Sequence, residues 1–176
     1  MKRNLLLWQF SGFAMSSLVG TLLHFLYEWT NESVLTAPFS GVNESTWEHM
    51  KLLYFPLLIF AFVQSGYFKE YENYWCIKLI GILTGLIMIP LVFYTYNGAF
   101  GKSPDWLNIT FFFISAAVSF TIETRLFYKN NLRCKRPRLA FLLICLIGVF
   151  FVVFTFAPPQ IPLFKDPLTD TYGIAN

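Results

Sequence analysis

The chain has 176 residues, of which 56% are hydrophobic and 13% are charged, and its mean hydropathy is +0.53. A soluble domain usually carries about 25% charged residues, so this composition excludes an ordinary soluble domain and indicates a polytopic protein in contact with a lipid bilayer. The formal net charge is only +3, and the basic residues are concentrated in loops, so nucleic acid is not an expected partner.

Five segments meet or approach the length of about 20 apolar residues that a helix needs to cross the hydrocarbon core. We therefore expect an all-α integral membrane bundle of five transmembrane helices, forming one domain over residues 1–176. The predicted spans cover residues 5–27, 52–68, 75–96, 106–127 and 139–157, with an outer loop at 28–51 and an outer tail at 158–176.

Basic residues orient the bundle, because cytoplasmic loops carry an excess of Lys and Arg. The loop at 130–138 is short and dense in basic residues, so we expect the N-terminus inside, the C-terminus outside and a multi-pass protein of the plasma membrane. The inner set would then be Lys2, Arg3, Lys69, Lys78, Arg125, Lys129, Arg133, Lys135, Arg136 and Arg138, and the outer set Lys51, Lys102 and Lys165.

The first predicted helix carries a face of small residues that ends in two titratable groups. Gly12, Ser16 and Gly20 recur every four residues and are followed by His24 and Glu28. Small residues at this spacing let a neighbouring helix approach closely, and a histidine and a glutamate at i and i+4 can touch.

Similar small faces occur in two later helices, at Gly81 and Gly85 and at Ser115, Ser119 and Glu123. We expect the three helices to pack through these faces, although the same faces could instead join copies in a homo-oligomer. Glu123 is either an acid on a pathway through the bundle or a carboxylate paired with Arg125, Lys78 or another inner base.

The outer loop holds most of the other candidate chemistry. Asn43 or Ser45 can cap a helix that continues into the second span, and Glu48 follows Ser45 at the spacing of a capping box. Both histidines of the chain and four carboxylates fall in or beside this loop, and the candidate binding residues are His24, Glu28, Glu44, Glu48 and His49.

This cluster has three interpretations. One is a divalent metal site formed by His24, Glu44, Glu48 and His49, because imidazole and carboxylate together suit zinc, iron or manganese. A second is an outward-facing vestibule that binds a cation or small ligand in a transport-like or sensor-like role. The third is a helix cap in a solvated loop, as in a structural or partner-binding protein.

An enzyme is the main alternative, namely a membrane-embedded metal-dependent hydrolase in which Glu44 or Glu48 activates a metal-bound water. The sequence lacks HxxxH and HExxH pairs, and two histidines are too few for the seven-helix zinc hydrolases. A haem held by His24 and His49 is a further geometric alternative. Whether the protein is an enzyme is left open by the residues.

The tail contains four prolines between residues 158 and 167, so it is expected to be extended and stiff. Its apolar residues favour a path along the outer surface. Asp166, Asp170, Thr171 and Tyr172 could then cover the mouth of the cluster as a lid, or simply form a surface-anchored tail.

The three cysteines, Cys76, Cys134 and Cys145, have no metal-ligand spacing. Their odd number and scattered positions argue against a disulfide framework, and we expect them to pack as small apolar residues.

Two segments resemble a family of small bacterial polytopic membrane proteins of unknown function. They are Asn43-Glu44-Ser45-x-Trp47-Glu48-His49-x-Lys51 and the tail Phe-Ala-Pro-Pro-x-Ile-Pro-Leu-Phe-x-Asp-Pro with its later Thr-Tyr-Gly-Ile. The resemblance covers nearly the whole chain and implies a single compact bundle, but it implies no activity.

Overall fold

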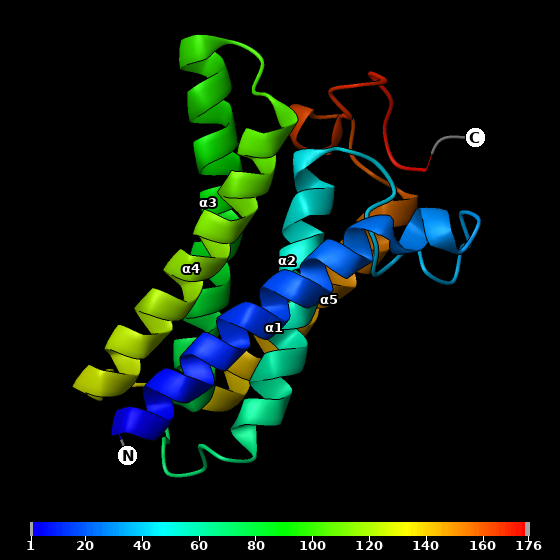
Figure 1. Cartoon of the computed structure of the whole chain (residues 1–176). Helices are drawn as coiled ribbons and strands as arrows, with labels where there is room; N and C mark the ends of the chain where they lie inside the picture. The colour runs from blue at the N-terminus through cyan, green and yellow to red at the C-terminus, as the bar shows by residue number, and fades with distance from the viewer. Residues whose placement is uncertain (1, 175–176) are drawn as a thin grey trace.

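The computed structural model describes residues 2–174, which form five long helices and one short helical turn (Figure 1). Within these residues the extended structure is limited to an isolated bridge between Lys165 and Tyr172. The helices are α1 (Lys2–Trp29), α2 (Thr46–Ser65), α3 (Tyr74–Phe100), α4 (Asp105–Lys129), α5 (Pro137–Phe156) and the 3-10 turn η1 (Pro162–Phe164).

Successive helices run in opposite directions, so the start of α1 and the tail lie at opposite ends of the bundle (Figure 1). The second helix begins at Thr46, inside the predicted outer loop, and contacts all four other long helices. α2 is therefore the central helix of the fold, and its first turns belong to the end of the bundle that carries the tail.

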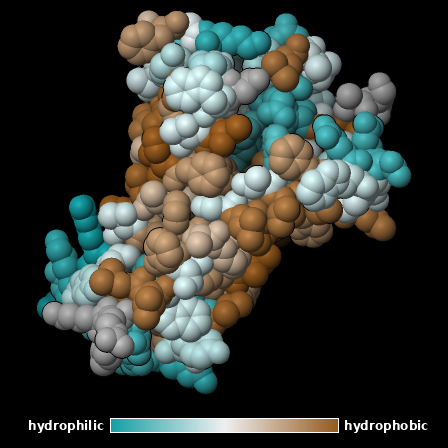
Figure 2. Space-filling view, viewed as in Figure 1, coloured by the Kyte–Doolittle hydropathy of each residue, from teal (hydrophilic) through white to brown (hydrophobic). Residues whose placement is uncertain are grey.

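Four helices are long and apolar enough to cross a membrane, at Asn4–Trp29, Tyr74–Phe100, Trp106–Lys129 and Pro137–Phe156. Hydrophobic residues cover the middle of the visible face, and hydrophilic ones gather toward its two ends (Figure 2). α2 is not among the four, since it carries buried polar groups such as Glu48, Lys51 and Gln64. These three groups are buried against neighbouring elements, so they meet protein rather than lipid. A fifth span remains a prediction.

The small faces of α3 and α4 meet as expected. Gly85 packs against Ser119 Cβ, Gly81 packs against Glu123, and the Ser119 hydroxyl donates a 2.8 Å hydrogen bond to the Gly81 carbonyl. The two helices can approach this closely because neither glycine has a side chain. The prediction of a close small-residue contact is correct for this pair of helices.

The small face of α1 packs differently. Gly12 lies under the rings of Phe60 and Phe120, and Gly20 lies under the ring of Phe112. The glycines of α1 thus receive aromatic rings from α2 and α4 rather than a second small face, so that part of the expectation is wrong. A homo-oligomer through any of these faces stays a prediction.

A disulfide joins Cys76, in the first turn of α3, to Cys134, in the connection between α4 and α5. The two Cα atoms are 6.2 Å apart, and Cys145 is free. The expectation of three unpaired thiols is therefore wrong for two of them. Their separation of 58 residues hid the pairing, although both lie at the same end of the bundle.

Candidate metal centre

The loop after α1 folds back over the end of that helix. The Gly41 amide donates a 3.3 Å hydrogen bond to the Leu23 carbonyl, which returns the chain to the last turns of α1. Beyond it, Asn43 Oδ1 accepts from the Ser45 amide, and Ser45 Oγ caps α2 by accepting from the Glu48 amide at 3.3 Å. Glu44 is thereby held between two anchored residues, directly beside His24.

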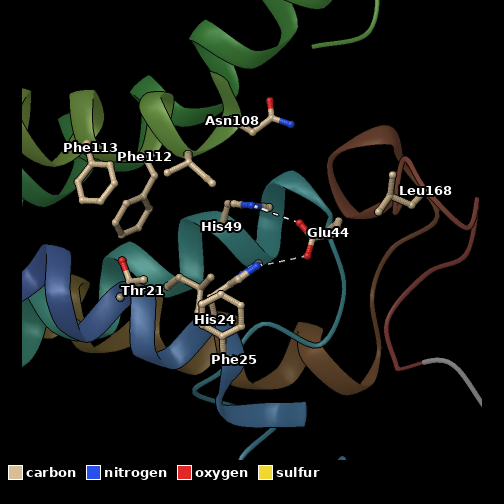
Figure 3. Close-up of a pocket in the computed structure, with 12 residues that line it drawn as sticks. Thr21, His24, Phe25, Glu44, His49, Asn108, Phe112, Phe113 and Leu168 are labelled. Atoms are coloured by element: carbon tan, nitrogen blue, oxygen red, sulfur yellow. Dashed lines mark ion pairs between the residues drawn. The ribbon is translucent and has the colours of Figure 1, made fainter. Parts of the chain in front are cut away.

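Three predicted ligands come together at this point, one from α1, one from the loop and one from α2 (Figure 3). His24 Nε2 lies 3.5 Å from Glu44 Oε1, and His49 Nε2 lies 3.6 Å from Glu44 Oε2. One ligand atom from each of the three lies within 4.8 Å of the other two. We name His24, Glu44 and His49 the outer triad.

The orientation of the His49 ring is fixed by the start of α2. Its Nδ1 lies 3.0 Å from the Ser45 carbonyl oxygen. A carbonyl oxygen only accepts, so Nδ1 carries the proton and a neutral ring keeps its lone pair on Nε2, which faces Glu44. Metal-binding histidines characteristically donate their other ring nitrogen in this way.

The spacing of the outer triad suits a small divalent ion. A tetrahedral ion with ligands at about 2.1 Å separates neighbouring ligand atoms by about 3.4 Å. His24 and His49 approach different oxygens of Glu44, at 3.5 and 3.6 Å, and one ligand atom from each of the three residues lies within 4.8 Å of the others, so a bound ion would draw the three groups slightly together. Two imidazoles and a carboxylate suit zinc and iron better than magnesium or calcium.

A cavity of about 360 Å³ opens beside the triad, between α1 and α4. Leu52 of α2 also lines it. Leu168 of the tail borders it (Figure 3). Most of the remaining wall is aromatic or aliphatic, formed by Phe25, Ile109, Phe112 and Phe113, with Thr21, Asn108 and Gly20 completing it. Three protein ligands beside a cavity leave a coordination position accessible to a further ligand.

Glu48, the fourth predicted metal ligand, faces elsewhere. Its Oε2 lies 2.6 Å from the Lys51 amine and accepts a hydrogen bond from the Val42 amide. Lys51 is 0% exposed and also donates to the Ala37 carbonyl and to Thr155 Oγ1. Glu48 thus joins the loop, α2 and α5 in a buried ion pair, and stands outside the outer triad.

Glu28 lies one helical turn beyond His24, on the exposed side of α1. Its carboxylate forms no ion pair or side-chain hydrogen bond with the side chains that the structure describes, and the expected contact with His24 is replaced by the contact of His24 with Glu44. Glu28 contributes charge near the triad but no ligand atom.

Glu123 belongs to a second, separate polar cluster toward the other end of the bundle. It is 1% exposed, its Oε2 lies 2.6 Å from the Lys78 amine, and Gln9 Nε2 donates to the same oxygen at 3.3 Å. Gln64 in turn donates to Gln9 Oε1 at 3.2 Å. The pairing interpretation with Lys78 therefore holds, but the carboxylate is enclosed by helices rather than reaching outward to water.

The tail reaches the site through an apolar residue. Leu168 borders the cavity, whereas Asp166 accepts from the Leu168 amide and Asp170 pairs with Lys165 at 2.8 Å. The hydrogen bond to Asp170 raises the pKa of the Lys165 amine. Tyr172 bridges to Lys165 through the backbone. Asp166, Asp170 and Tyr172, three of the predicted lid residues, thus stabilise the fold of the tail.

The tail is attached to the loop and to α2. Asn43 Nδ2 donates a 2.8 Å hydrogen bond to the Gly173 carbonyl, and the rings of Phe164 and Trp47 lie 4.6 Å apart. Gly173 has a φ of +66° and packs against Pro158, where a side chain would be strained. These contacts connect both segments that carried the family resemblance.

Sequence reasoning missed the contribution of α4 to the site. Asn108, Phe112 and Phe113 lie in an apolar stretch that reads as an ordinary span. α1 and α4 diverge at this end of the bundle, as Figure 1 shows. The sequence of neither helix indicates this divergence.

Comparison with known proteins gives one match. No curated protein and no solved structure is similar enough to the chain to support an argument about its function. A family model described as "Family of unknown function (DUF6512)" matches residues 2–174, which is nearly the whole chain. The protein therefore belongs to this family of unknown function.

Proposed function

We propose that the protein is a membrane protein that binds a divalent transition metal, zinc foremost, at the outer triad. The observation that carries the proposal is the convergence of three ligand atoms within 4.8 Å. The hydrogen bond from His49 Nδ1 to the Ser45 carbonyl supports it, because it leaves Nε2 as the ligand atom. On the predicted topology, the site faces the outside of the plasma membrane.

Binding is a better account than conduction. Residues 10–23 of α1, 52–63 of α2 and 106–122 of α4 contain no charged side chain. A cation moving inward from the triad along these helices would meet no charged group before the Lys78–Glu123 cluster. The geometry thus favours a sensor-like or ligand-presenting role over transport through the bundle.

Hydrolysis is less well supported than binding. Three ligands and an accessible fourth position are typical of catalytic zinc sites. However, Glu44 serves as a ligand in this proposal, and Glu48 is committed to Lys51 at 2.6 Å. Neither predicted general base is free to accept a proton from a metal-bound water.

The direct test is the zinc content of the purified protein after loading and desalting, measured by elemental mass spectrometry. We expect about one zinc per chain in the wild type and almost none in the His24→Ala/His49→Ala and Glu44→Gln variants. Glu28→Gln is the matched control, since Glu28 is the neighbouring carboxylate outside the triad. It should keep its zinc.

Equal melting temperatures would show that loss of metal is not loss of fold. A wild-type protein that holds no zinc, iron or manganese would contradict the proposal. So would a folded Glu44→Gln variant that retains the metal as well as the Glu28→Gln control does.

A further inference from the structure

The cavity beside the outer triad combines a metal-facing end with a hydrocarbon-facing wall. His24, Glu44 and His49 lie at one end, whereas Phe25, Phe112 and Phe113 line the rest. A ligand that fills such a space must have a polar head and an apolar body. This inference rests on the proposed function, because it uses the metal as the acceptor of the head group.

The cavity opens sideways rather than only toward water. Phe25 of α1 is 41% exposed, and Ile109 and Phe113 of α4 are 59% and 36% exposed. Both helices are among the four that can cross a membrane. The exposed apolar rim between them therefore faces the acyl chains of the bilayer, so a ligand can enter from the membrane.

The charge at the polar end favours an anionic head. A divalent metal held by one carboxylate and two neutral imidazoles keeps one net positive charge. A smaller recess adjoins the cavity and is lined by Glu44, Asn108 and Lys102. Metal and amine together would attract an anion at this point.

Asn108 supplies a hydrogen-bond donor beside these charges. The Asn97 amide donates to Ser103 Oγ at 3.2 Å, and the Ser103 hydroxyl donates to Asn108 Oδ1 at 2.7 Å. This chain of hydrogen bonds occupies the oxygen of Asn108 and leaves its Nδ2 group as a donor. The Asn108 amide can therefore donate a hydrogen bond to an anionic oxygen of the ligand.

The size of the cavity limits the apolar body. A volume of about 360 Å³ lies at the low end of small-molecule sites. It suits one chain, whose remainder can leave between α1 and α4, rather than the two chains of a phospholipid. We propose that the site takes a single-chain anionic membrane amphiphile, with its carboxylate or phosphate on the metal and its chain against α4.

The test uses full-length, zinc-loaded protein in a non-ionic detergent and follows ligand binding by native mass spectrometry and thermal shift. The probes are oleate, oleoyl lysophosphatidic acid, monooleoylglycerol and inorganic phosphate. We expect at least one anionic amphiphile to bind about tenfold more tightly than the neutral lipid of the same chain. Inorganic phosphate should bind more weakly still.

Two variants test the two ends of the cavity. Ile109→Trp, which fills the apolar wall, should weaken amphiphile binding about tenfold while zinc content is unchanged. Lys102→Gln should reduce the preference for the anionic over the neutral lipid. Leu142→Trp is the matched control, because Leu142 is an exposed residue on α5 outside the cavity, and it should bind like the wild type.

The outcomes separate this inference from the proposed function. A protein without metal contradicts the proposed function itself. A zinc-loaded protein that binds the neutral lipid equally well, or binds inorganic phosphate as tightly as the amphiphiles, retains the metal site and overturns the amphiphile. Equal effects of Ile109→Trp and Leu142→Trp would also overturn it.

Discussion

Lys78 and Glu123 form an ion pair inside the bundle, and its energy depends on both partners being present. The amine and carboxylate are 2.6 Å apart and almost fully buried, and Gln9 donates a further hydrogen bond to the carboxylate. Removing one member of such a pair leaves an uncompensated charge, whereas replacing both with apolar groups removes the cost of desolvation as well.

We therefore expect Glu123→Gln and Lys78→Met each to lower the free energy of unfolding by about 3–5 kcal/mol. The double variant Lys78→Met/Glu123→Leu should lose clearly less than the sum of the single losses. Denaturation in detergent measures both. Lys69→Met, which removes an exposed amine from the same end of the molecule, is the control and should change little.

The residues of the outer triad illustrate what local sequence can and cannot predict. The Ser45 cap follows from Ser-x-x-Glu spacing, and it correctly starts α2 before His49. The local sequence does not predict whether Glu44 or Glu48 lies beside the two histidines. The choice depends on Lys51, whose other partners, Ala37 and Thr155, are distant in sequence.

At the scale of helices, the contact between α3 and α4 depends on Gly81. A methyl group there would collide with the Glu123 side chain, which the ion pair with Lys78 holds in place. Gly98 lies in the same helix with no atom within 4 Å of an added Cβ. Alanine at Gly81 tests the effect of packing, and alanine at Gly98 tests the effect of helix propensity alone.

Gly81→Ala should destabilise the fold by about 1–3 kcal/mol, as expected for overpacking. Gly98→Ala should be neutral or stabilising by up to about 1 kcal/mol, because alanine favours a helix over glycine. Melting temperatures of the two variants in one detergent provide the measurement. Equal effects would mean that α4 moves away from α3 at little energetic cost.

Helix positions were largely predictable from apolar length, but their environments were not. The small faces of α3 and α4 predicted the contact between these helices, because each helix carries small residues at helical spacing. The same pattern in α1 could not reveal that Phe60, Phe112 and Phe120 fill its face. The central position of α2 was hidden too, since buried polar groups make it look less like a span.

At the scale of the whole molecule, two chemical cues about orientation oppose each other. Lys51 and Lys78 are buried, so neither belongs to a loop, yet the connection at 130–136 remains rich in Lys and Arg. That end should face the cytoplasm. The Cys76–Cys134 disulfide lies at the same end, whereas disulfides persist mainly in oxidising compartments.

We expect the basic residues to determine the topology, because several short-loop charges act together on insertion. In a cysteine-free background, Lys102→Cys should react with a membrane-impermeant maleimide in intact cells. Glu70→Cys, in the connection between α2 and α3, should react only after lysis. The structure joins the sulfurs of Cys76 and Cys134, but on this topology the bond would lie in a reducing compartment. We therefore expect thiol trapping before lysis to find the two thiols reduced in the cell.

Labelling of Glu70→Cys but not of Lys102→Cys in intact cells would reverse the topology, and with it the compartments of the disulfide and of the outer triad. The disulfide would then be a permanent bond in an oxidising compartment, and by chain entropy the closed loop would stabilise the fold by about 4 kcal/mol. The outer triad would face the cytoplasm and its metal pool. Because the triad and the disulfide lie at opposite ends of the helices, one labelling experiment assigns the compartment of both.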